Sequence, residues 1–582
     1  MTDTFTLEII KNGLVVANEE MFLSFARTAK SPVIYEVFDF AVGMTDRNGE
    51  LVAQAPGVPA FSGVLDFAAR EVLEKWRDDL KPGDIIVSNV PYNSGTHLND
   101  VTLILPMFRG DDFIGLIINK GHWSEIGGMA FGSWNPNATE IYQEGLQLPC
   151  VKLYSEGKLN KDMVDLILAN SRLPDYTYGD MEAQAASMKV AAKRVDKLID
   201  KYGLDGVLLA MRKLLEDGEK EARLRLKDLP KGEFEADDYI DSAIANTESP
   251  VHVQAKIVIS DEEFNVDFTG SDPQVMSPIN SPFPATVSGV REVFLAVTDP
   301  HTYPSGGFFR PLKVKAEQGS VFYPVRPAPT STDWEAIAFA TELVWKALAP
   351  SLPDRLPAGH FLSIVGTIIG GTNDITREPF AIVEPQPGGW GATSTSDGTD
   401  GLVACGDGET YIASSEVYEK NFPIIVERYS LNTEGKHGAG KFRGGFGVVR
   451  NYRMMNSKTF VTIQVGRHDF PPWGINGGQD GSGNKVVIYK NGKPAEIRRL
   501  SAEPLSKGDL VSIRTSSGGG FGNPLDRDPK MVLRDVRDEL ISVDIAREVY
   551  GVIVDPDKME VDLEKTQELR KKLRSFGDGR NE

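Results

Sequence analysis

The sequence predicts a multi-lobed α+β protein, and three observations support this fold class. The chain has 582 residues, several times the usual size of one domain, so two to four lobes are expected. Its first part mixes helical and strand-type hydrophobic patterns. Between Ile364 and Pro524, Gly- and Thr-rich stretches separate short strand-type segments, which predicts a β-rich, barrel- or sandwich-like C-terminal half. A helical tail is expected to close the chain.

The opening region is expected to begin with a helix and continue as strands. Residues 5–30 carry apolar side chains at helical spacing. The stretch SPVIYEVFDFAVGMTD has a strand-like pattern, and the Asn-Gly pair that follows it predicts a hairpin turn. A second helix is expected from about Val64 to Leu80, and KPGDIIVSN predicts a turn followed by a buried strand.

The remaining elements divide the chain into four regions. Two long amphipathic helices are predicted between residues 161 and 228, divided near Gly203. Strands VHVQAKIVIS and FNVDFTG and the helix STDWEAIAFATELVWKALAPSL follow, and Gly clusters such as SSGGGFGNP are interpreted as tight turns. The predicted regions are a mixed α/β region 1–230 that ends in the two long helices, a mixed α/β region 231–420, a Gly-rich β domain 421–528 and a helical tail 529–582.

Composition narrows the function classes. A formal net charge of −20 repels phosphate backbones and anionic membrane surfaces, which disfavours nucleic acid and membranes as partners. The two cysteines, Cys150 and Cys405, are too few for a disulfide framework and fit a reducing compartment. No secretory signal is recognised and no apolar run reaches the roughly 18 residues that cross a bilayer. We therefore expect a cytoplasmic protein.

A candidate hairpin brings scarce histidines together. The apolar runs VTLILPMF and FIGLIINKG flank the turn sequence RGDD, and the whole chain has only seven histidines. An unbroken ladder from this turn pairs Arg109 with Asp112, Asp100 with Gly121, and Asn99 with His122. The side chains of Asp100 and His122 then lie at the same open end of the ladder.

This end of the hairpin is a candidate metal site. His97 lies three residues before Asp100 in a Gly-containing loop and can fold back to the same place. Two imidazoles and a carboxylate suit zinc, manganese, iron or cobalt. The alternative is a structural pair in which a buried His is hydrogen-bonded to an Asp. The other five histidines are scattered, and no phosphate loop, serine elbow or C-x-x-C motif is present.

The motifs resemble a known family. NVPYNSGTHLNDVTLILPMF, GHWSEIGG and IYQEGLQLP are similar to segments of the hydantoinase B / 5-oxoprolinase B family, to which metal-bearing subunits of acetone and acetophenone carboxylases are related. Further similarities are SPVIYEVFDFAVGMTD, the Gly-rich ERYSLNTEGKHGAGKFRGGFGVVR, and SSGGGFGNPLDRDPKMVLRDV near the end. These separated motifs occur in the family's order, so the resemblance covers almost the whole chain.

The resemblance implies a set of site residues. It assigns the metal ligands to His97, Asp100, His122 and Asp39, and places the metal in region 1–230. Glu36 is the alternative to Asp39; in a strand the two point to opposite faces, so only one is expected to be a ligand. Glu125 is the candidate for proton transfer or for supporting the ligands, with a purely orienting role as the alternative.

The resemblance also implies a two-component enzyme. A hydantoinase A-type partner subunit would use ATP-Mg to phosphorylate the carbonyl oxygen of a lactam, hydantoin or oxoproline-type ring. This chain would hold a divalent metal, zinc or manganese, whose activated water opens the ring, in a heterotetramer or larger assembly. One alternative is a subunit of an ATP-dependent ketone carboxylase. The other is a non-catalytic scaffold with a structural metal, which would be fully coordinated and closed to solvent.

Overall fold

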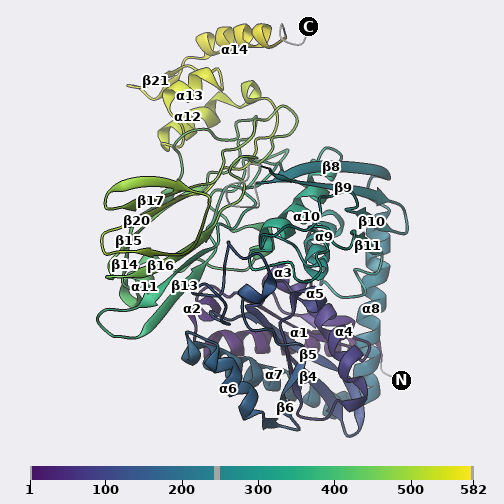
Figure 1. Cartoon of the computed structure of the whole chain (residues 1–582). Helices are drawn as coiled ribbons and strands as arrows, with labels where there is room; N and C mark the ends of the chain where they lie inside the picture. The colour runs from purple at the N-terminus through teal and green to yellow at the C-terminus, as the bar shows by residue number, and fades with distance from the viewer. Residues whose placement is uncertain (1–2, 242–248, 579–582) are drawn as a thin grey trace.

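The computed structural model describes residues 3–241 and 249–578 and shows a mixed α+β molecule with several separate sheets (Figure 1). The predicted α+β class is confirmed, together with the helical C-terminal end. Within the described residues the strands form sheets of seven, four, four, five and two strands, and none of these sheets closes into a barrel. None of the described helices has the length and apolar character needed to cross a membrane.

The N-terminal region is built on the seven-stranded sheet, in the order β2-β1-β5-β4-β3-β6-β7. Its strands are β1 (Phe40–Thr45), β2 (Leu51–Gln54), β3 (Ile85–Ser88), β4 (Asp100–Arg109), β5 (Asp112–His122), β6 (Val151–Ser155) and β7 (Lys158–Leu159). The central hairpin of β4 and β5 is the longest pairing in this sheet. Helix α1 (Thr4–Thr28) begins at Asp3, whose side chain accepts a hydrogen bond from the backbone N–H of Thr6.

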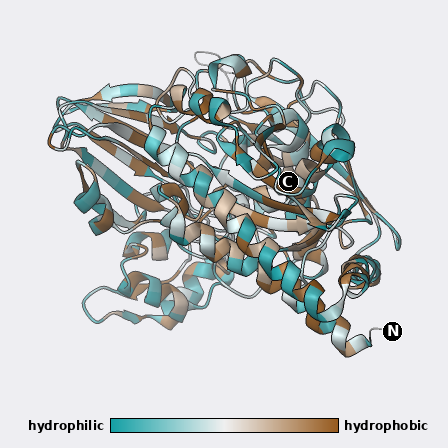
Figure 2. Ribbon diagram, turned by 90° about the horizontal axis from the view of Figure 1, so that it is seen from below, coloured by the Kyte–Doolittle hydropathy of each residue, from teal (hydrophilic) through white to brown (hydrophobic). Residues whose placement is uncertain are grey.

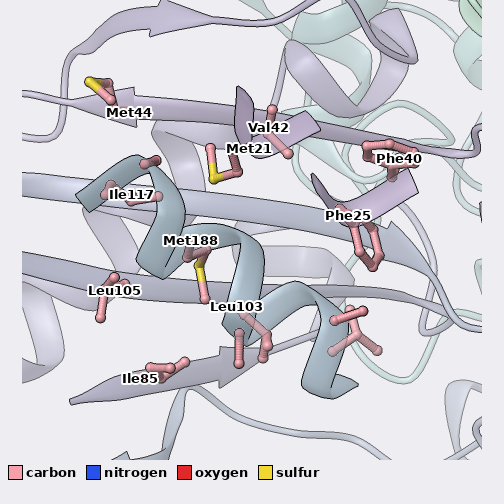
Figure 3. Close-up of a cluster of buried hydrophobic side chains, with 14 of the residues drawn as sticks. Met21, Phe25, Phe40, Val42, Met44, Ile85, Leu103, Leu105, Ile117 and Met188 are labelled. Carbon is pink, nitrogen blue, oxygen red and sulfur yellow. The ribbon is translucent and has the colours of Figure 1, made fainter. Parts of the chain in front are cut away.

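Helices cover both faces of this sheet, which explains its nearly continuous apolar strands. On one face Leu103 and Leu105 of β4 pack with side chains of α1 and α7 (Pro174–Tyr202), as Figure 3 shows. On the other face Ile104 packs with helix α4 (Leu65–Trp76). Helix α7 is followed at Gly203, whose φ is +79°, by α8 (Leu204–Leu226), so the predicted division is confirmed. A separate helix α6 (Lys161–Ala169) precedes them. Viewed from below, the helix nearest the N-terminus carries intermixed hydrophilic and hydrophobic residues (Figure 2).

The central hairpin contains a β-bulge that changes the predicted register. Near the turn the expected pairs are found, Arg109 with Asp112 and Phe108 with Phe113. The register then shifts between Met107 and Phe108, so the rest of the ladder is displaced by one residue and Asp100 pairs directly with His122. The predicted pairs of Asp100 with Gly121 and Asn99 with His122 are therefore wrong, because counting from the turn assumes an unbroken ladder.

The stretch SPVIYEVF is not a strand. It forms the short helix α2 (Pro32–Tyr35), and β1 begins only at Phe40. Pro32 occupies the first helical position. The carboxylate of Asp180 accepts a hydrogen bond from the backbone N–H of Ser31 at 3.0 Å, and this bond holds the residue at which the helix begins. Because Glu36 caps a helix, strand alternation does not relate it to Asp39, and the argument that placed them on opposite faces fails.

The middle of the chain forms a sheet with helices on one face. Strands β8 (Gly232–Ile240), β9 (Val251–Ile259), β10 (Phe264–Asp267) and β11 (Leu312–Lys315) lie in the order β11-β10-β9-β8. Alternate residues of β9 are buried, as expected for a sheet with one covered face. Helices α9 (Phe283–Thr298) and α10 (Trp334–Leu348) share a hydrophobic core with this sheet.

Two further sheets form a sandwich. The sequence predicts a barrel- or sandwich-like half here, and the structure has the sandwich. One has the order β13-β12-β16-β19 and the other β14-β15-β20-β17-β18, and both contribute to one apolar core. Their bounds are β12 (Thr367–Thr372), β13 (Pro379–Glu384), β14 (Ile424–Leu431), β15 (Val448–Met454), β16 (Thr459–Gln464), β17 (Lys485–Lys490), β18 (Lys493–Ile497), β19 (Arg499–Leu505) and β20 (Leu510–Arg514). Helix α11 (Ser415–Asn421) packs at its edge through Tyr418.

The Gly clusters are sites of close backbone packing. The N–H of Gly445 donates to the carbonyl of Trp390 at 2.8 Å, and the N–H of Gly518 donates to the carbonyl of Gly445 at 2.9 Å. A Cβ on Gly518 would lie 2.1 Å from the carbonyl oxygen of Trp390. The interpretation of SSGGGFGNP as a tight turn is wrong for Gly518–Gly520, since none of the three has a positive φ and each backbone approaches another too closely for a side chain.

The buried guanidinium group of Arg527 links the helical tail to this Gly-rich region. It comprises α12 (Pro529–Arg537), α13 (Val543–Glu548), β21 (Val554–Asp555), β22 (Glu560–Val561) and α14 (Leu563–Asp578), at the top of Figure 1. Arg527 is fully buried and donates to Asp397 at 2.6 and 2.7 Å and to Asp535 at 2.7 Å. Because both carboxylates pair with it, this charge is compensated in the interior.

We expect Gly518→Ala to lower the free energy of unfolding by about 3 kcal/mol, which is the upper end of the usual cost of overpacking a protein interior. The added methyl group would meet backbone atoms that cannot move aside. Calorimetry on the purified chain measures this as a lowered Tm. The matched control is Gly406→Ala, whose methyl group would meet its nearest neighbours at 3.8 and 3.9 Å. Equal Tm values for the two variants would contradict the packing account.

Candidate metal centre

The register of the central hairpin brings a carboxylate and an imidazole face to face. Asp100 is the first residue of β4, His122 is the last residue of β5, and the two are paired. His97 lies in the loop after helix α5 (Pro91–Ser94), and its backbone N–H donates to the Asp100 carboxylate at 3.2 Å. All three residues are buried, and one donor atom from each lies within 4.8 Å of the others.

Hydrogen bonds orient both rings. The indole N–H of Trp134 lies 3.1 Å from Nε2 of His97 and 3.1 Å from Nε2 of His122, so the Nε2 atoms accept. Nδ1 of His97 is 2.8 Å from Oδ2 of Asp100 and 3.4 Å from Oδ1 of Asp333. Nδ1 of His122, Oδ1 of Asp100 and Oδ2 of Asp333 are buried and have no hydrogen-bond partner within the described part of the chain. The two carboxylate oxygens are free to bind a cation, whereas Nδ1 of His122 carries the ring proton while Nε2 accepts, and it must lose that proton before it binds one.

A cavity of about 50 Å³ adjoins this cluster and is lined by an excess of acids. Its walls include His97 and His122 together with Asp39, Asp333 and Asp407. Glu384 also lines it, but its carboxylate accepts from the hydroxyl of Tyr418 at 2.7 Å and from Arg450 at 3.1 Å. Each buried, ionised carboxylate without a neighbouring cation costs several kcal/mol of folding free energy, the penalty of an unpaired buried ion.

The pKa values reflect this excess of negative charge. Burial raises the pKa of Asp39, and the carboxylates of Asp100 and Asp407 raise it further. Burial raises the pKa of Asp333 to about 6 and, with the charge of Asp100, that of Asp407 to about 7. Burial lowers the pKa of His97, but Asp100 and Asp333 outweigh it and raise the value to about 10. For His122, burial and the neighbouring His97 lower the pKa to about 3.

The donor set fits a divalent cation. Imidazole nitrogens and carboxylate oxygens are ligands that Zn²⁺ and Mn²⁺ accept, and several of these donors are otherwise unpaired. The structure brings His97, Asp100 and His122 together. Asp39 lines the same cavity and its backbone carbonyl accepts the N–H of His122 at 3.1 Å, but its carboxylate is outside the closest group. Its role as a ligand stays a prediction.

Glu125 is buried in a hydrogen-bonded network beside the site. Its carboxylate accepts the backbone N–H groups of Gly127 and Gly132 and the hydroxyl of Ser133, each at 2.9 Å. Arg172 donates to it at 2.8 Å. Burial raises its pKa, which Arg172 opposes. Glu125 is not among the residues that line the cavity, so this arrangement favours the orienting role over direct proton transfer.

Sequence reasoning missed the two acids that come from distant parts of the chain. Asp333 precedes helix α10 and Asp407 lies in the 3-10 turn η3 (Cys405–Asp407), both more than 200 residues from His122. Glu144 holds the segment that carries Asp333, because its carboxylate accepts the N–H groups of Thr330 and Ser331 at 2.9 and 2.8 Å. Glu144 belongs to the motif IYQEGLQLP, but that motif does not indicate that Asp333 or Asp407 would join the site.

Lys120 supports the cluster from inside the sheet. Its buried ammonium donates to the backbone carbonyl of Asp100 at 2.9 Å, and burial lowers its pKa. Asp241, His468 and Asp469 form a second group of possible ligands. Asp241 already accepts the backbone N–H groups of His468 and Asp469 at 2.9 and 3.0 Å, and Arg498 binds Asp469 at 2.6 Å. The first group is therefore the better cation site.

The fold is shared with two solved enzyme structures. The chain superimposes on the crystal structure of ATP-dependent caprolactamase from Pseudomonas jessenii with a TM-score of 0.92 and 26% identity, covering 98% of this chain and 99% of that one. A nucleotide-free structure of acetone carboxylase has the same fold, with a TM-score of 0.93 at 20% identity over 99% of this chain and 84% of that one.

Sequence comparison identifies the family to which the chain belongs. The profile of the family described as Hydantoinase B/oxoprolinase matches residues 3–524, so the chain belongs to that family. The B subunit of a putative D-/L-hydantoinase from Pseudomonas sp. (strain NS671) is 32% identical over 98% of each chain. The family resemblance carried by the GTHLND and GHWSEIGG motifs is thereby confirmed.

We expect the purified chain to retain one divalent cation after dialysis, and His122→Ala to lose it, because that substitution removes an unpaired ring nitrogen. Elemental analysis by mass spectrometry measures the metal content per chain. The matched control is His301→Ala, which changes an exposed histidine far along the sequence. A His122→Ala protein with the metal content of the wild type would overturn the site.

Proposed function

We propose that this chain is the metal-dependent subunit of a two-component, ATP-dependent hydrolase of cyclic amides. Its substrate is a lactam, hydantoin or oxoproline-type ring whose carbonyl oxygen is phosphorylated by a hydantoinase A-type partner using ATP-Mg. The observation that carries the proposal is the buried group of His97, Asp100 and His122 beside a cavity, in a chain of the Hydantoinase B/oxoprolinase family.

The proposed cation ligands are His97, Asp100, His122 and Asp39, with zinc or manganese as the metal. When bound, the cation supplies Lewis-acid chemistry, which makes water acidic and polarises a carbonyl or phosphoryl oxygen. The chain's own residues fix the geometry, since Trp134 holds both imidazoles and Lys120 holds the backbone of Asp100. Oδ2 of Asp407 is buried without a hydrogen-bond partner among the described residues and is available to take a proton from water.

Phosphorylation of the ring carbonyl gives a physical role to ATP. An amide carbonyl resists attack by water, and a phosphoryl group on its oxygen makes the carbonyl carbon more electrophilic. Water adds to that carbon, the C–N bond breaks with its electron pair and a proton going to the ring nitrogen, and the remaining acyl phosphate is hydrolysed to a carboxylate and phosphate. The site of ATP use is assigned to the partner, in agreement with the absence of a G-x-x-x-x-G-K-[ST] phosphate loop from this sequence. Two relatives are named as the B subunit of a hydantoinase and the beta subunit of caprolactamase, which supports a partnered enzyme, for which we propose a heterotetramer or larger assembly. The free thiols Cys150 and Cys405 support a cytoplasmic location.

The same site argues against a purely structural metal. Structural sites are closed by four protein ligands, whereas both histidines here line a cavity. At roughly 10–15 Å³ for each water, that cavity has room for a few water molecules. An accessible position beside the ligands supports a reactive role over the scaffold alternative.

A ketone carboxylase subunit is the second candidate. It is favoured by the fold shared with acetone carboxylase, which at 20% identity indicates architecture alone. In that reaction the same cation would stabilise an enolate, and carbon dioxide would replace water as the reactant. The 26% identity with caprolactamase over nearly the whole chain favours hydrolysis.

The proposal predicts that the chain, purified with its ATP-binding partner, opens a hydantoin, caprolactam or oxoproline ring with release of ADP and without bicarbonate. His97→Ala should reduce ring opening at least about 100-fold, because this ligand also orients Asp100 and Asp333. ATP binding by the partner should persist. Liquid chromatography of ring and product measures the reaction.

His301→Ala serves as the control and should keep the wild-type rate. Ring opening at the wild-type rate by a metal-free His97→Ala protein would contradict the proposed site. Bicarbonate-dependent consumption of a ketone, with no ring opened, would instead assign the chain to the carboxylases.

A further inference from the structure

We propose that a chamber of about 760 Å³ beside the metal cavity binds the uncharged, apolar part of the ring substrate, with Glu292 hydrogen-bonded to the ring. This inference rests on the proposed hydrolase function and names the substrate class that the site accepts. It selects rings with an apolar substituent over rings that carry a carboxylate.

The size of the metal cavity requires a second compartment. Its volume of about 50 Å³ accommodates a few water molecules but not a five- to seven-membered ring. The neighbouring chamber has a volume of about 760 Å³, within the range of roughly 300–1,000 Å³ that is usual for small-molecule sites. A ring whose carbonyl reaches the cation must therefore place its remaining atoms outside the metal cavity.

The two spaces adjoin each other. Thr410 lines both of them, and Pro59 lines the chamber while its neighbour Ala60 lines the metal cavity. In the turn η3, Cys405 faces the chamber and Asp407 faces the metal cavity. Helix α9 contacts both α10 and α3 (Pro59–Ser62), and these elements lie near the centre of the molecule (Figure 1).

Aromatic and aliphatic groups form most of the chamber. The indole N–H of Trp345 donates to the carbonyl of Pro357 at 2.6 Å, and that of Trp390 donates to the carbonyl of Val403 at 2.8 Å. Both tryptophans are thus fixed, and their ring surfaces are offered to an apolar ligand. The ionisable lining consists of Glu292, Glu409 and Arg355. With Glu292 protonated, the charges of Glu409 and Arg355 balance, so the lining offers no net positive charge to a carboxylate on the ligand.

Glu292 is the polar group built into this lining. Both of its carboxyl oxygens are buried and accept no hydrogen bond from an N–H or O–H donor of the described residues, and the thiol of Cys405, a weak donor, is a hydrogen-bond partner. A ligand can supply the stronger pairing that a buried carboxyl needs. Burial, together with the carboxylate of Asp407, raises its pKa to about 8, so at neutral pH it is mostly protonated. A neutral carboxyl can both donate to a ring carbonyl and accept from a ring N–H.

Calorimetric titration of the whole chain at neutral pH tests the inference, with 5-benzylhydantoin as the apolar ring and hydantoin-5-acetate as the same ring with a carboxylate. We expect saturable binding of 5-benzylhydantoin, at least ten-fold tighter than hydantoin-5-acetate. Ala296→Phe fills the chamber and should weaken binding at least ten-fold. Ala186→Phe, on the exposed face of α7, is the matched control and should bind as the wild type does.

Two substitutions separate hydrogen bonding from charge at Glu292. Glu292→Gln keeps a neutral donor and acceptor and should stay within about three-fold of the wild type. Glu292→Leu removes both and should weaken 5-benzylhydantoin about ten-fold without loss of folding, since no unpaired polar group is left.

Wild-type affinity in Ala296→Phe, equal affinity for the two rings, or no saturable binding would overturn the inference. Loss of partner association in Ala296→Phe, with ring binding intact, would assign the chamber to the partner protein and would also overturn it. Ring binding without ATP-dependent opening would contradict the hydrolase and leave the chamber intact. Ring opening that is unchanged by Ala296→Phe would contradict the chamber as the binding site and leave the hydrolase function intact.

Discussion

The direct pairing of Asp100 with His122 is the constraint on which the candidate site depends. Side chains of paired residues in an antiparallel ladder project to the same face, with Cβ atoms about 5 Å apart. A one-residue displacement of either strand would turn one of these side chains to the other face. The β-bulge near Met107 sets this pairing, and the helices packed on both faces of the sheet hold the register.

Other parts of the chain complete the surroundings of this pair. The segment before α10 brings Asp333, the turn η3 brings Asp407, and Trp134 holds both imidazoles. Their common property is burial together with excess negative charge, and buried carboxylates of this kind are costly unless they are protonated or lie beside a cation. Residues of the same turn η3 line both the metal cavity and the larger apolar chamber, so the charged site and the neutral one are adjacent.

Local patterns were sufficient for much of the fold and for the centre of the site. Helices α1, α4, α7, α8 and α10 follow from apolar spacing, and the hairpin follows from two apolar runs around a short turn. The bulge was not predictable, because no residue type marks where a ladder gains one residue. The closely packed Gly backbones around Gly518 also escaped prediction, since glycine favours turns and close approach alike. Asp333 and Asp407 reach the cavity through tertiary folding, which leaves no local signal.

The central claim is that one divalent cation binds at the open end of the β4–β5 hairpin. Anomalous diffraction from crystals of the native protein, collected on both sides of the metal absorption edge, tests this claim most directly. The account predicts a single peak at about 2.0–2.2 Å from nitrogens of His97 and His122 and an oxygen of Asp100. A fully occupied metal found only at Asp241, His468 and Asp469, or no peak between the two histidines, would contradict it.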